Sequence, residues 1–189
     1  MDLIKSDTSS RPFTSANSQS TAIPNDVAFA IGECALGKVI VARSPVGVCA
    51  ILIGSDAEEL KRNLAARFPE GKLIPNKLEL RDDLSKVVRF IETPSEGLDL
   101  AFDMRGTRFQ RRVWDALRRI PCGAMVTYSA LARRIGMPNS TRAVANACAA
   151  NAIALGIPCH RVVRSNGTLS GYRWGVERKR ALIVKEAAA

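Results

Sequence analysis

The most reactive pair of side chains in the sequence is Cys159 followed directly by His160, the only histidine in 189 residues. A cysteine thiol with an unperturbed pKa near ~8.5 is only a few per cent thiolate at neutral pH, and the thiolate is the nucleophile. An imidazole that takes up the thiol proton, directly or through water, raises that fraction. A Cys-His dipeptide alone is weak evidence, so the residues around it decide whether it performs chemistry.

The other cysteines offer little further chemistry. The five cysteines stand at irregular spacing, no C-x-x-C pair occurs, and a single histidine leaves little for a zinc site. We therefore predict reduced thiols, no metal and no other cofactor. We expect four of the cysteines to be packing residues, namely Cys34, Cys49, Cys122 and Cys148.

The net charge of +10 is unevenly distributed along the chain. Residues 1–104 hold 12 Lys/Arg and 15 Asp/Glu, whereas residues 105–189 hold 16 Lys/Arg and 3 Asp/Glu. A basic second half favours a polyanion partner, although a solvated basic face explains the same counts. DNA or RNA is favoured over a membrane, because the basic residues do not lie on one long amphipathic helix and no apolar run approaches the length of a membrane span.

The first half of the chain has the pattern of a small α+β domain. Nine of the sixteen residues 6–21 are Ser or Thr, so we expect a disordered tail over residues 1–24. The following pattern predicts an antiparallel sheet with flanking helices over residues 25–104. The expected strands are 27–34, 38–44, 46–53 and 98–103, and the expected helices are 57–68 and 78–91.

The second half, residues 105–189, is predicted to be mainly helical. Thr107 is a good N-cap for a helix over 108–120, and Thr127 for a short helix ending at 135. A turn over 136–140 separates that helix from another over 141–150, which predicts a helix-turn-helix. A last helix is expected over about 176–187. The predicted fold class is therefore α+β, with an antiparallel-sheet domain followed by a helical domain.

The helix over 141–150 has a face of small residues. Arg142, Ala145, Asn146 and Ala149 share one side, and only Arg142 is large. This pattern is equally typical of an alanine-rich helix packed on a neighbour. As a DNA-binding helix it offers few side chains to read base edges, so it favours shape or minor-groove binding. A nucleophile that acts on a base needs the base outside the stack, and Arg142 has the reach to fill the gap.

Together these residues resemble the O6-methylguanine–DNA methyltransferase family. The core of the resemblance is Pro158-Cys159-His160-Arg161-Val162, preceded by Asn151, with Arg142 nine residues before that asparagine. The resemblance covers about residues 26–187 and is densest after Arg105. The further matching segments are 105–110, 113–114, 120–123, 127–128, 167–175 and 177–179.

The resemblance implies a role for each residue near the thiol. Cys159 is the alkyl acceptor, and His160 acts through a bridging water as the base that raises its thiolate fraction. Glu177 orients His160; the alternative is an ordinary acid in the first turn of a helix. Asn151 stabilises the hinge before the Cys159 segment. Tyr128 contacts the phosphate of the target nucleotide, assists flipping and donates a hydrogen bond to the departing guanine.

The resemblance also implies a DNA-binding surface and a base pocket. Arg142 takes the place of the flipped nucleotide, and Ala143 and Ala149 contact the DNA. The base pocket is implied to include Tyr172, Trp174, Val162 and Ser165.

The implied reaction transfers the alkyl group of O6-alkylguanine in double-stranded DNA, with O4-alkylthymine as a further candidate, to Cys159. A thioether is a poor leaving group, so we expect one turnover per molecule and no cofactor. We expect a monomer that acts in the bacterial cytoplasm or at the nucleoid. Some relatives also carry a zinc-cysteine sensing domain, and we do not expect that function here, because no cysteine cluster precedes Cys34.

Two other functions are compatible with parts of the pattern. A cysteine hydrolase or other thiol enzyme predicts many turnovers without DNA. A DNA-binding regulator with a structural Cys159 predicts full function in Cys159→Ala. Within the alkyltransferase interpretation, the large Trp174 and the absence of a proline ring at Ala154 predict a preference for methyl over bulky adducts and resistance to benzylguanine-type inactivators.

Overall fold

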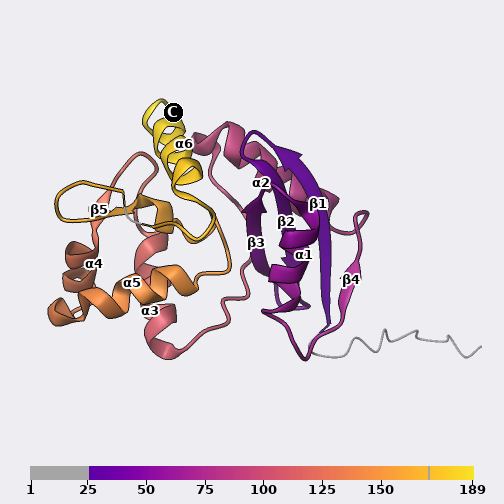
Figure 1. Ribbon diagram of the computed structural model, residues 1–189, viewed down its shortest axis with the longest axis horizontal. Coiled ribbons are helices and arrows are strands. Elements are labelled where there is room, and N and C mark those ends of the chain that lie inside the picture. Colours follow the sequence, from indigo (N-terminus) through magenta and orange to yellow (C-terminus); the bar gives the residue numbers. More distant parts are fainter. Residues whose placement is uncertain (1–25, 170) are drawn as a thin grey trace, which may run out of the picture.

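The structure, a computed structural model, describes residues 26–169 and 171–189. The tail predicted for residues 1–24 lies outside the described residues. Figure 1 shows two halves side by side: one is a β-sheet with helices packed on it, and the other is mainly helical. No helix in the described part of the chain is long and apolar enough to cross a membrane.

The first half is built on a four-stranded sheet in the order β3-β2-β1-β4. Strands β1 (Val27–Cys34), β2 (Gly37–Arg43) and β3 (Val48–Gly54) pair in antiparallel fashion, as predicted. The short strand β4 (Leu73–Pro75) was not predicted and pairs parallel with β1, so the sheet is mixed rather than antiparallel. Its length of three residues and its Pro75 suit only an edge position, because proline cannot donate to a ladder.

The helices α1 (Ala57–Ala65) and α2 (Arg81–Glu92) pack on this sheet and are followed by the short 3-10 helix η1 (Pro94–Glu96). Both helices are shorter than predicted. The prediction of a strand over 98–103 was wrong, because this segment forms only an isolated β-bridge between Phe102 and Val48. Val48 takes both hydrogen bonds of that bridge, so no ladder develops.

The second half contains the predicted helices at similar positions. Helix α3 (Arg108–Arg118) begins with a complete capping box at Thr107, and α4 (Tyr128–Arg134) begins at Thr127, whose hydroxyl accepts from the Ala130 backbone N–H. The 3-10 turn η2 (Pro138–Ser140) joins α4 to α5 (Thr141–Ala150). The two helices pack together and complete the predicted helix-turn-helix.

A short parallel pair of strands holds the segment that carries the cysteine. Strand β5 (Val126–Thr127) precedes α4, and β6 (Val162–Val163) follows the 3-10 turn η3 (Cys159–Arg161). The last helix, α6 (Val176–Ala187), begins after a loop and packs on η3. The β5–β6 pair therefore ties the start of the helix-turn-helix to Val162, which directly follows η3.

The two halves are joined by backbone hydrogen bonds. Ile51 in β3 donates to the Ala152 carbonyl and accepts from the Ala154 backbone N–H. In Figure 1 the β3 edge of the sheet is the one that faces the helical half. The segment that leads from α5 to Cys159 is thus paired with the sheet, which fixes its position.

Candidate active site

Cys159 lies in the core of the helical half with 6% of its surface exposed. Asn151, the residue that ends α5, is completely buried beside it and donates from Nδ2 to the Cys159 Sγ at 3.4 Å. The same Nδ2 donates to the Ile157 carbonyl at 2.9 Å, and Oδ1 accepts from the Ile153 backbone N–H at 2.8 Å. The structure therefore brings Asn151 and Cys159 together, and the asparagine also holds the backbone of Ile153 and Ile157 between them.

His160 is completely buried, and its ring contacts a carboxylate on α6. The His160 Nε2 lies 2.7 Å from Glu186 Oε1. Arg161 donates to both oxygens of the same carboxylate, at 2.8 Å from Nη2 to Oε1 and 2.9 Å from Nε to Oε2. The Gly123 backbone N–H lies 3.3 Å from Oε2. One carboxylate thus orders the imidazole, the adjacent guanidinium and the loop after α3.

The prediction that Glu177 orients His160 was wrong. The Glu177 side chain is 82% exposed in the first turn of α6 and pairs with Arg180 at 2.7 Å. Glu186 comes nine positions after Glu177 in the helix, and at 3.6 residues per turn this places them on opposite faces. The buried face of α6 consists of Lys179, Leu182 and Glu186. Their i, i+3, i+7 spacing places them on one face, but two of the three are charged, so nothing in the sequence marks this face as the buried one.

The protonation states of the pair follow from this geometry. Burial alone raises the pKa of Glu186, but the hydrogen bonds from His160 and Arg161 outweigh it and lower the pKa to about 2. Burial lowers the pKa of His160, and Glu186 opposes this only in part. A neutral imidazole beside a carboxylate donates from Nε2, which leaves the Nδ1 lone pair as the basic site. That Nδ1 atom is buried and has no hydrogen-bond partner among the described residues.

Cys159 is a protonated thiol at rest. Burial raises its pKa, while the Asn151 hydrogen bond and the charge of Lys179 act in the opposite direction. Lys179 is itself completely buried, and its Nζ donates to the Val162 carbonyl at 2.6 Å. Lys179 lies within a segment that matches the family, but no role was predicted for it, because a lysine in a basic helix gives no sign of being buried. The thiol therefore needs a base, and a buried ammonium is available to stabilise the thiolate.

Two aromatic rings extend from the site. The Tyr172 ring lies edge-on to His160, with centroids 6.4 Å apart, and edge-on to Trp174, with centroids 5.0 Å apart. The Tyr172 hydroxyl is buried without a partner in the described part of the chain. Val162 is buried in β6, whereas Ser165 is exposed in the turn that follows. Thus the Tyr172 ring contacts both His160 and Trp174, and Ser165 is the only one of the four predicted pocket residues that is exposed.

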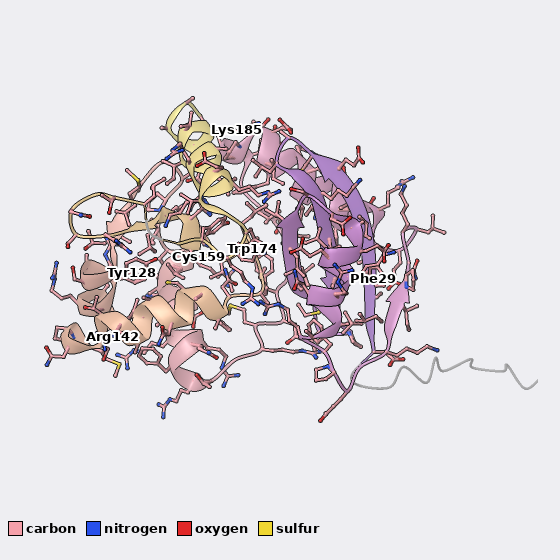
Figure 2. The ribbon with its side chains drawn as sticks, in the orientation of Figure 1. Phe29, Tyr128, Arg142, Cys159, Trp174 and Lys185 are labelled. Atoms are coloured by element: carbon pink, nitrogen blue, oxygen red, sulfur yellow. The ribbon has the colours of Figure 1, made fainter. Side chains whose placement is uncertain are left out.

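The candidate DNA-binding residues lie on the solvent side of the helix-turn-helix. Arg142, Ala143, Asn146 and Ala149 are exposed on α5, whereas Ala145 is half-buried. The opposite side of α5 packs on α3, where Trp114 Nε1 donates to the Ala147 carbonyl at 2.9 Å. Tyr128 is half-buried at the start of α4. Figure 2 shows Arg142 at the outer end of α5, with Cys159 farther toward the centre of the molecule.

The other cysteines do not form a second site. Cys49 and Cys148 are buried and Cys34 is half-buried, as expected of packing residues. Cys122 is exposed, so the packing prediction was wrong for that residue. No group of three or more His, Cys, Asp or Glu side chains in the described ranges could hold a metal ion.

Comparison with known proteins identifies the family. Residues 108–188 match the family model described as 6-O-methylguanine DNA methyltransferase, DNA binding domain. The chain is 49% identical over 161 residues to the bifunctional transcriptional activator/DNA repair enzyme Ada of Escherichia coli. The matched region covers 85% of this chain and 46% of that protein. It is 38% identical over 148 residues to the methylated-DNA–protein-cysteine methyltransferase of Candida albicans, covering 74% of this chain and 83% of that protein.

The fold supports the same assignment. The crystal structure of the Mycobacterium tuberculosis O6-methylguanine methyltransferase aligns with a TM-score of 0.68 and 32% identity, covering 86% of this chain and 93% of that one. The structure of the same bacterium's enzyme in complex with DNA aligns with a TM-score of 0.69 and 30% identity, covering 85% and 93%. The chain belongs to the O6-methylguanine–DNA methyltransferase family. It spans about half the length of the two Ada proteins that it matches.

Proposed function

We propose that the chain repairs DNA by transferring the methyl group of O6-methylguanine to the Sγ atom of Cys159. The observation that carries this proposal is the hydrogen-bonded series from Glu186 through His160, next to a cysteine held by Asn151. This arrangement supplies a nucleophile, a base whose free nitrogen is Nδ1, and a carboxylate that orients the base, which are the parts of an activated thiol site.

The DNA approaches the exposed side of α5. The small residues Ala143 and Ala149 allow the helix to enter the minor groove, and Arg142 replaces the target nucleotide in the stack. Tyr128, at the start of α4, contacts the phosphate of the flipped nucleotide. The extruded guanine then lies against Tyr172 and Trp174, beside His160.

The transfer follows from the protonation states of the free protein. His160 Nδ1 takes the Cys159 proton, directly or through one water, and Glu186 stabilises the resulting imidazolium. The Lys179 ammonium stabilises the thiolate. The thiolate forms a bond to the methyl carbon as the bond from that carbon to O6 breaks. The electron pair of the broken bond stays on the guanine, and the Tyr128 hydroxyl donates a hydrogen bond or proton to the departing base.

The product is S-methylcysteine, and each molecule reacts once. A thioether sulfur is a poor leaving group, so water does not restore the thiol. The same attack is chemically possible on O4-methylthymine, which makes it a second candidate substrate. We propose that the protein acts as a monomer on double-stranded DNA, and hence wherever the chromosomal DNA lies.

The test is mass spectrometry after mixing the protein with a duplex that carries one O6-methylguanine. We expect a gain of one methyl group per chain, located on Cys159, and no gain in Cys159→Ser. The matched control is Cys122→Ser, because Cys122 is exposed and is the cysteine most accessible to adventitious alkylation. Methylation lost in Cys122→Ser but kept in Cys159→Ser, or many methyl groups removed per chain, would exclude the proposal.

A further inference from the structure

A polar cleft of about 380 Å³ lies between the two halves of the molecule, outside the cysteine site. One wall comes from the end of β3, from α1 and from Arg67, which follows α1. The other wall comes from Arg173, Trp174 and Arg178. Figure 2 places Trp174 between Cys159 and the sheet, so the cleft begins on the far side of the proposed base pocket.

Arg67 lies in this cleft and forms no ion pair with any residue that the structure describes. Its Nε and Nη2 atoms are buried and have no hydrogen-bond partner in the described structure. Burial, and then the positive charge of Arg173, lower its pKa to about 10. A buried polar group without a partner is costly, and such groups in folded proteins call for an explanation. Arg161 shows the usual arrangement, since it is buried against the carboxylate of Glu186.

The other two arginines of the cleft have different tasks. Each guanidinium nitrogen of Arg178 donates a hydrogen bond: to the Leu36 carbonyl, the Trp174 carbonyl and the Ser55 hydroxyl. This guanidinium therefore holds the two halves together. Arg173 is exposed and makes one such bond, from Nη1 to the Ala149 carbonyl at 3.0 Å. Arg173 therefore connects the cleft with the last turn of α5.

The only acidic residue that lines the cleft, among the described residues, is Glu59. It is exposed in the first turn of α1 and forms no ion pair with Arg67. The cleft is therefore cationic, and the buried nitrogens of Arg67 have donor capacity for an oxygen-rich anion. A guanidinium suits a phosphate group in particular, because its planar set of N–H groups matches two phosphate oxygens.

We propose that Arg67 and Arg173 bind a backbone phosphate of the DNA, so that the sheet domain contributes to DNA binding. This inference rests on the proposed function, which places the DNA on the exposed side of α5. Arg173 is bonded to Ala149 at the end of that side, so a strand that continues beyond α5 meets Arg173 first and Arg67 next. The phosphate offsets the repulsion between the two arginines and satisfies the buried donors of Arg67.

The experiment compares Arg67→Gln with Arg62→Gln in the full chain. Arg62 lies on α1, five positions before Arg67, is exposed and does not line the cleft, so its removal is the matched change in charge. Binding to a duplex with one O6-methylguanine is measured by fluorescence anisotropy over a range of salt concentrations. Cys159→Ser is present in all binding samples to prevent reaction.

We expect Arg67→Gln to weaken binding about tenfold, the effect of one lost charge-assisted hydrogen bond, and Arg62→Gln to leave it within about twofold. The slope of the logarithm of the binding constant against the logarithm of the salt concentration should become less steep by about 0.9 in Arg67→Gln only. Wild-type affinity and slope in Arg67→Gln would overturn the inference.

Two further results separate the alternatives. If inorganic phosphate raises the melting temperature of the wild type but not of Arg67→Gln, while DNA binding is equal in both, the site binds a free anion and the DNA inference is wrong. A wild-type protein that binds duplex DNA through Arg67 without methylation of Cys159 would refute the proposed function and leave the phosphate site intact.

Discussion

Replacement of Glu186 by glutamine tests the central contact of the site. The substitution keeps the size of the side chain but removes the charge that faces His160 and Arg161. The ordinary pKa of 4.5 falls to about 2 in the folded protein. A difference of this size corresponds to about 3 kcal/mol of stability at neutral pH. Loss of one partner of a buried ion pair costs a similar amount, about 3–5 kcal/mol, because the other charge is left uncompensated.

We expect Glu186→Gln to lower the free energy of unfolding by about 3 kcal/mol at neutral pH, or the melting temperature by about 6–12 °C for a chain of this size. The rate of the single methyl transfer should fall about 10- to 100-fold, because His160 loses the group that orients it and stabilises its charge. Urea unfolding and a rapid-quench measurement of Cys159 methylation check the two effects.

The pH dependence gives a second measurement of the same contact. Because the folded pKa of Glu186 is depressed, its contribution to stability is complete above pH 4.5 and is lost as the pH falls through about 2. The difference in stability between the wild type and Glu186→Gln should therefore shrink between pH 4.5 and 2. The control is Glu177→Gln, an exposed residue on the opposite face of α6, for which we expect a change within about 0.5 kcal/mol. Equal effects of the two substitutions would refute the reasoning.

Two other substitutions test the surroundings of the thiol. Lys179→Met should raise the pKa of Cys159, because it removes a positive charge that lowers this pKa. Methyl transfer at neutral pH should therefore slow several-fold and recover at higher pH. An unchanged pH–rate profile would contradict this role. Trp114→Phe should lower the free energy of unfolding in urea by about 1–3 kcal/mol, because it removes the buried hydrogen bond to the Ala147 carbonyl that connects α3 with α5. No loss of stability would show that this hydrogen bond does not contribute.

Local features of the sequence were sufficient to predict the helices around the site, although not the 3-10 turn η3 or the β5–β6 pair that hold Cys159. Thr107 and Thr127 cap their helices as predicted, since an N-cap depends on residues within one turn of it. The turn between α4 and α5 is likewise local. The pairing of Cys159 with His160 is a property of adjacent residues, and its setting was recognisable from short motifs.

The tertiary structure decided which distant residues meet. The family resemblance implied Glu177 as the acid that orients His160, but the rotation of α6 turns Glu177 to solvent and brings Glu186 to the imidazole. Strand β4 forms only because β1 offers an open edge, which no pattern within three residues reveals. The burial of Lys179 depends on how α6 packs, and that of Arg67 on how the segment after α1 packs. Burial and pairing of charges arise from contacts between elements far apart in the chain, so the local pattern could not determine them.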